Sequence, residues 1–137
     1  MNNIPLQQKI AQIIEKDATY PEEAYEFVTN VIHFATKNNE KKEDASRHIG
    51  AKKIIKASVD YALNEYGFFA QEVLLNFNII KAIDIGNIVF NLIEVELLRQ
   101  SDDDSLEDFN FECNILNSIE QHKKKFVVRS DEIPTIG

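Results

Sequence analysis

The sequence predicts a mainly α-helical protein, a compact domain of five to six helices with at most a small β-hairpin. The first observation behind this prediction is the run DIGNIVFNLIEVELL at residues 84–98, which is longer and more continuously apolar than a typical strand. The second is that apolar residues in four further segments recur at intervals of three and four, the spacing of one helix face. At 137 residues, the chain is long enough to bury a core without disulfides.

The run at residues 84–98 is the expected central helix. Asp84 is the expected N-cap, because its short carboxylate can accept the free amides of the first turn. Gly86 lowers helix stability unless a neighbour needs the space, so we expect close packing there. A helix with so few polar positions is apolar around most of its circumference and belongs in a core. Those positions are Asn87, Asn91, Glu94 and Glu96.

Two amphipathic helices are expected before this segment. The first spans Pro5 to Lys16. The second begins near Thr19, because Thr19 and Glu22 have the spacing of a capping box and Pro21 is tolerated in a first turn. The second helix ends in the polar stretch 37–48, which is the expected loop.

Two more helices are expected between this loop and the central helix. One spans Gly50 to Tyr66 and ends at Gly67, which suits the left-handed position after a helix. The next spans Phe68 to Phe77, with Phe69 among its inward-facing residues.

The segment after the central helix is ambiguous. Residues 101–105, SDDDS, predict a solvated turn. Phe109 to Glu112 alternates as a strand does, and we favour a strand there, followed by a helix to about His122, although Leu106, Phe109, Cys113, Leu116 and Ile119 also fit one helix face. A single domain is expected over residues 1–122, followed by an extended tail over 123–137.

Three blocks of the sequence resemble one protein family. They are DATYPEEAYEFV, then His48 ahead of a helix ending in Tyr66-Gly67, and then GNIVFNLIEVELL followed by DDDSLEDFNF. Over about residues 10–112 the chain resembles the Minf family of small uncharacterised bacterial proteins. The family usually has a glycine where this chain has Glu96. The resemblance implies no activity, substrate or catalytic residue.

Composition favours a cytoplasmic protein. A single cysteine, Cys113, cannot pair within the chain and is typical of a reducing compartment. The N-terminal residues lack the pattern of a secretory signal, and no apolar run approaches the length of a membrane span, so no membrane association is expected.

No motif for catalysis, metal binding or cofactor binding is found in the sequence. The three histidines, His33, His48 and His122, have no metal-ligand spacing, and His33 is expected to be half-buried near an apolar face. The acidic stretch 102–108 lacks the glycine and the final acid of a calcium loop. The four glycines are isolated, and Cys113 is expected to be packed rather than reactive. We therefore predict that the protein is not an enzyme and holds no cofactor or metal.

Charge and apolar patterning predict an interaction module, an accessory subunit that binds a protein partner within a larger assembly. The alternative is a winged-helix-like protein bound to nucleic acid or to the ribosome, with residues 98–112 as the wing. Residues 84–112 carry nine acidic side chains and one basic side chain, which disfavours duplex DNA there, while RNA or a ribonucleoprotein remains open. The candidate partner contacts are a basic patch and an apolar patch in the tail, namely Arg47, Lys52, Lys53 and Lys56, and Phe126, Val127 and Val128.

Overall fold

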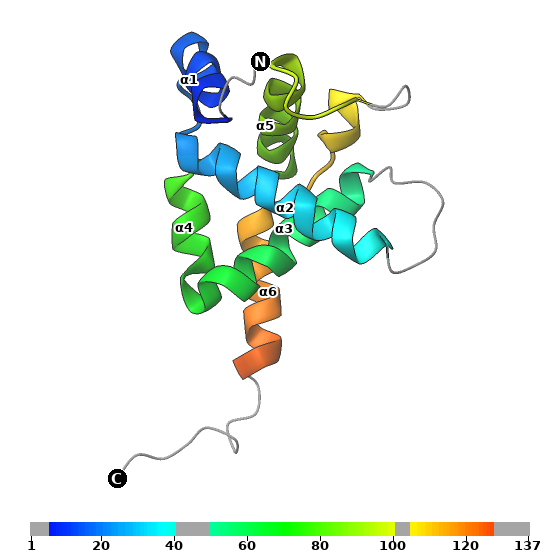
Figure 1. Ribbon diagram of the computed structural model, residues 1–137. Helices are drawn as coiled ribbons and strands as arrows, with labels where there is room; N and C mark the ends of the chain where they lie inside the picture. The colour runs from blue at the N-terminus through cyan, green and yellow to red at the C-terminus, as the bar shows by residue number, and fades with distance from the viewer. Residues whose placement is uncertain (1–5, 41–49, 101–104, 128–137) are drawn as a thin grey trace.

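The computed structural model describes residues 6–40, 50–100 and 105–127, and within them it confirms the mainly α-helical fold class (Figure 1). These residues form six α-helices and two short 3₁₀ helices, η1 and η2. No strand is present among them, and the nearest feature is an isolated bridge between Lys81 and Asn114. In chain order the elements are α1 (Leu6–Lys16), α2 (Glu22–Glu40), α3 (Ala51–Tyr66), η1 (Gly67–Phe69), α4 (Ala70–Asn76), α5 (Ala82–Glu94), η2 (Leu106–Phe109) and α6 (Ile115–Val127).

Helices α2 and α3 pack together and form the middle of the molecule. Helices α1 and α5 and the turn η2 lie at one end of this pair, and α4 and α6 lie at the other end (Figure 1). Aromatic rings fill part of the α2–α3 interface, where Phe27 lies 5.8 Å from Tyr61 and 6.2 Å from Tyr66 between ring centroids. The two ends are also joined through the backbone, because the amide of Ile115 donates to the carbonyl of Ile80 at 2.7 Å.

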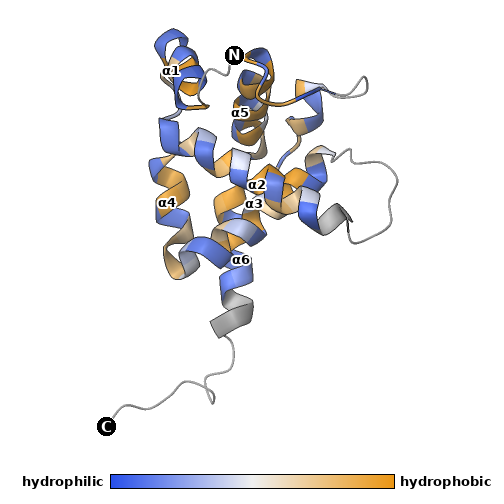
Figure 2. Ribbon diagram, in the orientation of Figure 1, coloured by the Kyte–Doolittle hydropathy of each residue, from blue (hydrophilic) through white to orange (hydrophobic). Residues whose placement is uncertain are grey.

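The central position of α5 is confirmed. It contacts α2, α3 and η2, and Figure 2 shows much of its ribbon in apolar colours. Its buried residues are Ala82, Ile85, Gly86, Ile88, Val89 and Leu92.

Asp84 is not the N-cap of α5. The helix begins at Ala82, so Asp84 is the third helical residue, and its Oδ2 accepts the amides of Ile80 and Lys81, each at 2.9 Å. The carboxylate still satisfies amides at the helix start, but it reaches back to them from inside the first turn.

The expected close packing at Gly86 is confirmed, because Gly86 lies directly against Phe109 of η2. A Cβ built on Gly86 would lie 2.6 Å from Cβ of Phe109 and 2.7 Å from its Cγ. Both residues are buried, so the absence of a side chain at position 86 is what lets η2 lie against α5.

Helix α5 ends four residues before Leu98, at a Schellman turn. The amide of Leu97 donates to the carbonyl of Leu92, and that of Glu96 to the carbonyl of Ile93, both at 2.9 Å. Glu96 has a φ of 64°, in the left-handed region that favours glycine. The turn is therefore formed here by a residue for which this φ is unfavourable.

We expect Glu96→Gly to stabilise the fold by about 0.5–1 kcal/mol, because glycine adopts this φ without steric cost. Urea unfolding followed by circular dichroism measures the change. Glu96→Ala is the matched control, since it removes the same charge and keeps the strained backbone. An equal gain in both variants would mean that relief of acidic repulsion, and not φ, is the cause.

The N-terminal helices are confirmed, but the predicted capping box is wrong. The hydroxyl of Thr19 donates to the carboxylate of Asp17, and the amide of Thr19 donates to the same oxygen at 3.0 Å. Thr19 therefore closes a local turn, and α2 begins at Glu22, directly after Pro21. Helix α2 also continues to Glu40, through the start of the predicted loop, and residues 41–49 of that loop lie outside the described residues.

Helix α3 and its end at Gly67 are confirmed, since Gly67 has a φ of 58° and its amide donates to the carbonyl of Leu63. The helix predicted from Phe68 to Phe77 is divided into η1 and α4. Leu74 is fully buried there, but Phe69 is 69% exposed and not inward-facing.

The predicted strand at Phe109 to Glu112 is wrong. Ser105 and Asp108 form a capping box in which the amide of Glu107 donates to Ser105 Oγ at 3.2 Å and the amide of Ser105 donates to Asp108 Oδ2 at 3.0 Å. This pair fixes η2 as a helical turn, so the described residues of segment 98–112 contain no strand from which a wing could form. Helix α6 then continues to Val127, which corrects its predicted end at His122 and makes residues 123–127 helical and not extended. Residues 128–137 of the predicted tail lie outside the described residues.

Candidate functional site

A groove runs between α3 and the C-terminal segment made of the link after η2 and α6. It consists of two hollows, of about 550 and 230 Å³, that both border on Asp60 and His122. We call it the α3–α6 groove. Its floor is apolar, formed by the α3 residues Ile55, Val59 and Leu63. Its rim carries the basic residues Lys52, Lys56 and Lys123 and the aromatic residues Phe111 and Phe68.

A lysine lies over an aromatic ring at each end of the groove. Lys52 Nζ is 5.9 Å from the ring centroid of Phe111, and Lys123 Nζ is 5.9 Å from that of Phe68. Lys123 also donates to the carbonyl of Phe68 at 2.6 Å and to Gln71 Oε1 at 2.7 Å. Helix α6 is therefore fastened to η1 by the Lys123 side chain.

The middle of the groove holds an ion pair and a histidine. Lys56 Nζ lies 3.0 Å from Asp60 Oδ2, one turn along α3. His122 Nδ1 lies 2.8 Å from the carbonyl of Ser118, so Nδ1 carries the proton it donates and Nε2 is the remaining ring nitrogen. The charge of Lys56 is thus largely offset locally, whereas Lys52 and Lys123 have no carboxylate partner among the described residues.

Two of the predicted contact residues, Lys52 and Lys56, line this groove. Lys53 is exposed on α3 but does not line it. Arg47 and Val128 lie outside the described residues. Phe126 and Val127 belong to the last turn of α6, which extends past the other helices (Figure 1).

Sequence reasoning missed the groove's other members. Phe68, Phe111, His122 and Lys123 are each far from residues 52–56 in sequence, and the fold brings them to the same surface. A signal was present at Phe68 and Phe69, two adjacent large aromatic residues after a helix-ending glycine.

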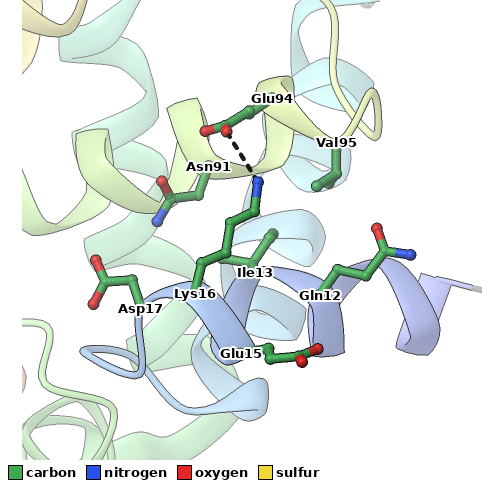
Figure 3. A pocket seen from close by; sticks show the side chains of 8 residues that line it. All are labelled: Gln12, Ile13, Glu15, Lys16, Asp17, Asn91, Glu94 and Val95. Atoms are coloured by element: carbon green, nitrogen blue, oxygen red, sulfur yellow. Dashed lines mark ion pairs between the residues drawn. The ribbon is translucent and has the colours of Figure 1, made fainter.

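A second groove, of about 710 Å³, lies between α1 and α5, and six of its eight lining residues have polar side chains (Figure 3). Lys16 on α1 reaches toward Glu94 on α5, with Nζ and Oε1 3.8 Å apart, and both side chains are largely exposed. Asp17 and Asn91 lie beside the Lys16 side chain, on the side away from Gln12 and Val95. An exposed pair at this distance contributes little energy, and the groove carries more acidic than basic groups.

A buried polar cluster joins the start of α2 to α5. The hydroxyl of Tyr20 donates to Asp84 Oδ1 at 2.8 Å and accepts from Asn87 Nδ2 at 3.1 Å. One turn further along, Asn91 Nδ2 donates to the hydroxyl of Tyr25 at 3.0 Å. Asn87 and Asn91 are therefore structural, because each donates to the hydroxyl of a buried tyrosine.

Burial raises the pKa of the Tyr20 hydroxyl, and the Asp84 carboxylate raises it further. Burial likewise raises the pKa of Tyr25. Both phenols are held neutral, which suits a structural role and not that of a general base.

Stability should decline at alkaline pH because of these tyrosines. A group whose pKa is raised by folding contributes stability below its unfolded pKa, about 10 for tyrosine, and loses that contribution as the pH rises through the folded pKa. We expect tyrosinate absorbance to appear at higher pH in the native protein than in urea. A Tyr20→Phe/Tyr25→Phe variant should lose much of this difference. Coinciding native and denatured titrations would contradict the prediction.

The described residues contain no cluster of three or more His, Cys, Asp or Glu that could hold a metal ion. His33 is exposed, which corrects its predicted half-buried position. Cys113 is half-buried and lies 3.9 Å from the hydroxyl of Ser118. Within the same residues, no helix is long and apolar enough to cross a membrane.

Comparison of the chain with protein-family models, with curated proteins and with solved structures finds no match. The resemblance to the Minf family stays a prediction. Functional inference therefore rests on the chain's own residues.

Proposed function

We propose that this chain is a non-enzymatic protein-interaction module of the cytoplasm, an accessory subunit that binds a partner protein in the α3–α6 groove. The observation that carries the proposal is the exposure of Phe68, 61%, which lines one end of this groove, and of the adjacent Phe69, 69%. Aromatic residues of this kind supply much of the binding energy at protein interfaces.

A core too small to bury large side chains does not explain the exposure of Phe68 and Phe69. Large side chains elsewhere are fully buried, including Tyr25, Phe27 and Leu74. Both rings follow Gly67, whose left-handed backbone turns η1 away from α3, and Figure 2 shows this turn at the foot of α4 in apolar colours. Exposed apolar surface next to a groove is a feature of binding sites.

Affinity purification of the tagged chain from its native cell, followed by mass spectrometry with and without nuclease, tests the proposal. We expect Phe68→Ser/Phe69→Ser to lose the partner while keeping the wild-type melting temperature. Leu6→Ser/Leu106→Ser is the matched control, because both leucines are 39% exposed and neither lines the groove. Equal recovery by both double variants would contradict the proposed site.

A second candidate function is binding of single-stranded RNA or of a ribonucleoprotein such as the ribosome. The observation that favours it is the placement of Lys52 over Phe111, since basic and aromatic side chains together bind single strands. Binding of an oligouridine that falls steeply with salt and is abolished by Lys52→Ala/Lys53→Ala/Lys56→Ala would support it. We expect no micromolar binding to random duplex DNA, because the acidic residues of 84–112 repel it.

A further inference from the structure

Resting on the proposed function, we infer that the α3–α6 groove takes an acidic amphipathic helix of about four turns, with its acidic residues at the two ends. The juxtaposition behind this inference is an apolar floor between two uncompensated lysines, Lys52 and Lys123.

The length of the groove sets the length of the occupant. Its lining runs along α3 from Lys52 to Gly67, which at 1.5 Å per residue is about 22 Å. A helix of about 15 residues spans this distance.

The residues of the floor and the rim determine which side chains the occupant should carry. Ile55 and Val59 are 6% and 4% exposed and close the bottom of the groove, so the apolar surface that a helix face can cover is that of Leu63, Phe68 and Phe111. The rim is basic on a protein whose net charge is −8, so an acidic partner is attracted to this groove and repelled by the acidic groove between α1 and α5.

The distribution of charge along the rim determines where the acidic residues of the ligand should lie. Lys56 is paired with Asp60 in the middle, so an acidic group placed there would meet a carboxylate. Lys123 bonds only neutral oxygens and Lys52 lies over a ring, so each end keeps an unneutralised positive charge. Acidic residues at the two ends of the ligand are therefore favoured over acidic residues in its middle.

A nucleic-acid strand fits the same lining less well. Stacking of successive bases needs exposed ring faces along the strand, whereas the floor between Phe111 at one end and Phe68 at the other is aliphatic. The middle of the rim also offers Asp60 to any phosphate that follows the groove.

Fluorescence anisotropy with the full chain and labelled synthetic helices tests the inference. The first probe is a four-turn helix with a leucine face and glutamates in its first and last turns. The second has the same composition with its glutamates moved to the two middle turns. We expect the first to bind at least about tenfold more tightly. The protein variants are Lys52→Glu and its matched control Lys53→Glu, which changes the same charge on the same turn outside the groove.

We expect Lys52→Glu to weaken binding of the first probe at least about tenfold, and Lys53→Glu to change it less than about threefold. Equal binding of the two probes, equal effects of the two variants, or no binding of the first probe would each overturn the inference. Tighter binding of an oligouridine that is lost in Lys52→Glu would replace it with a nucleic-acid site. If the Phe68→Ser/Phe69→Ser variant loses its cellular partner while neither probe binds, the proposed function stands and only the acidic-helix inference falls.

Discussion

Leu92→Ala should lower the free energy of unfolding by about 2–5 kcal/mol, the range for truncating a buried leucine. Leu92 is 0% exposed on the central helix, and its carbonyl also accepts the amide of Leu97 in the turn that ends α5. The truncation therefore opens a cavity where α5 meets its neighbours. Chemical denaturation followed by circular dichroism measures the loss.

Leu75→Ala is the matched control for this experiment. It removes the same atoms from an α-helix, but Leu75 is 52% exposed, so the expected cost is below about 1 kcal/mol. A loss below about 1 kcal/mol for Leu92→Ala as well would mean that α5 is peripheral.

The central helix could be predicted because its apolar composition requires a buried position. Residues 84–98 contain so many apolar positions that only an interior location satisfies them, and the structure places α5 in the core. The close packing at Gly86 could be predicted for a similar reason, because glycine inside a helix has a local cost that packing must offset.

The helix caps could not be predicted, because several residues compete for each cap. Thr19 has the right spacing to cap α2, but Asp17 lies two residues earlier and accepts both its hydroxyl and its amide. Asp84 can accept amides either as an N-cap or from the third helical position, and only the position of the preceding link decides between these.

The spacing of apolar residues in segment 106–120 fits both a strand and a helix, and local hydrogen bonds decide between the two. Ser105 and Asp108 have capping-box spacing, a signal present in the sequence that favours a helical turn over a strand. The resulting turn buries Phe109 against Gly86 and leaves Phe111 at the groove.

The α3–α6 groove as a whole could not be predicted, because tertiary contacts bring its two sides together. Lys52 and Lys56 were recognisable as a basic patch, but their neighbours Phe111, His122 and Lys123 come from a segment more than fifty residues away in the chain. Lys56 pairs with Asp60, which makes the middle of the rim nearly neutral. This pairing depends on side-chain rotamers and packing, so it could not be predicted from the sequence either.

Gly86→Ala should lower the free energy of unfolding by about 1–3 kcal/mol, although alanine is the better helix former. The new Cβ would lie 2.6 Å from Cβ of Phe109, an atom fixed to the backbone of η2 that cannot rotate away. Either η2 moves off α5 or the helix distorts, and both expose buried surface. The ring of Phe109 lies edge-on to Phe90 at 6.5 Å between centroids, so this contact is disturbed as well.

A double-mutant cycle with Phe109→Ala separates this clash from other effects of the added methyl group. Phe109→Ala alone should cost about 3–5 kcal/mol through the cavity it leaves. In that background Gly86→Ala should cost less than in the wild-type chain, because Cγ and the ring of residue 109 are gone, but a cost should remain because Cβ of residue 109 is still 2.6 Å away. Gly50→Ala serves as the glycine control, since a Cβ there would meet nothing within 4 Å, and its effect should stay within about 1 kcal/mol. Additive effects of Gly86→Ala and Phe109→Ala would show that the two residues do not meet, and the placement of η2 against α5 would then be wrong.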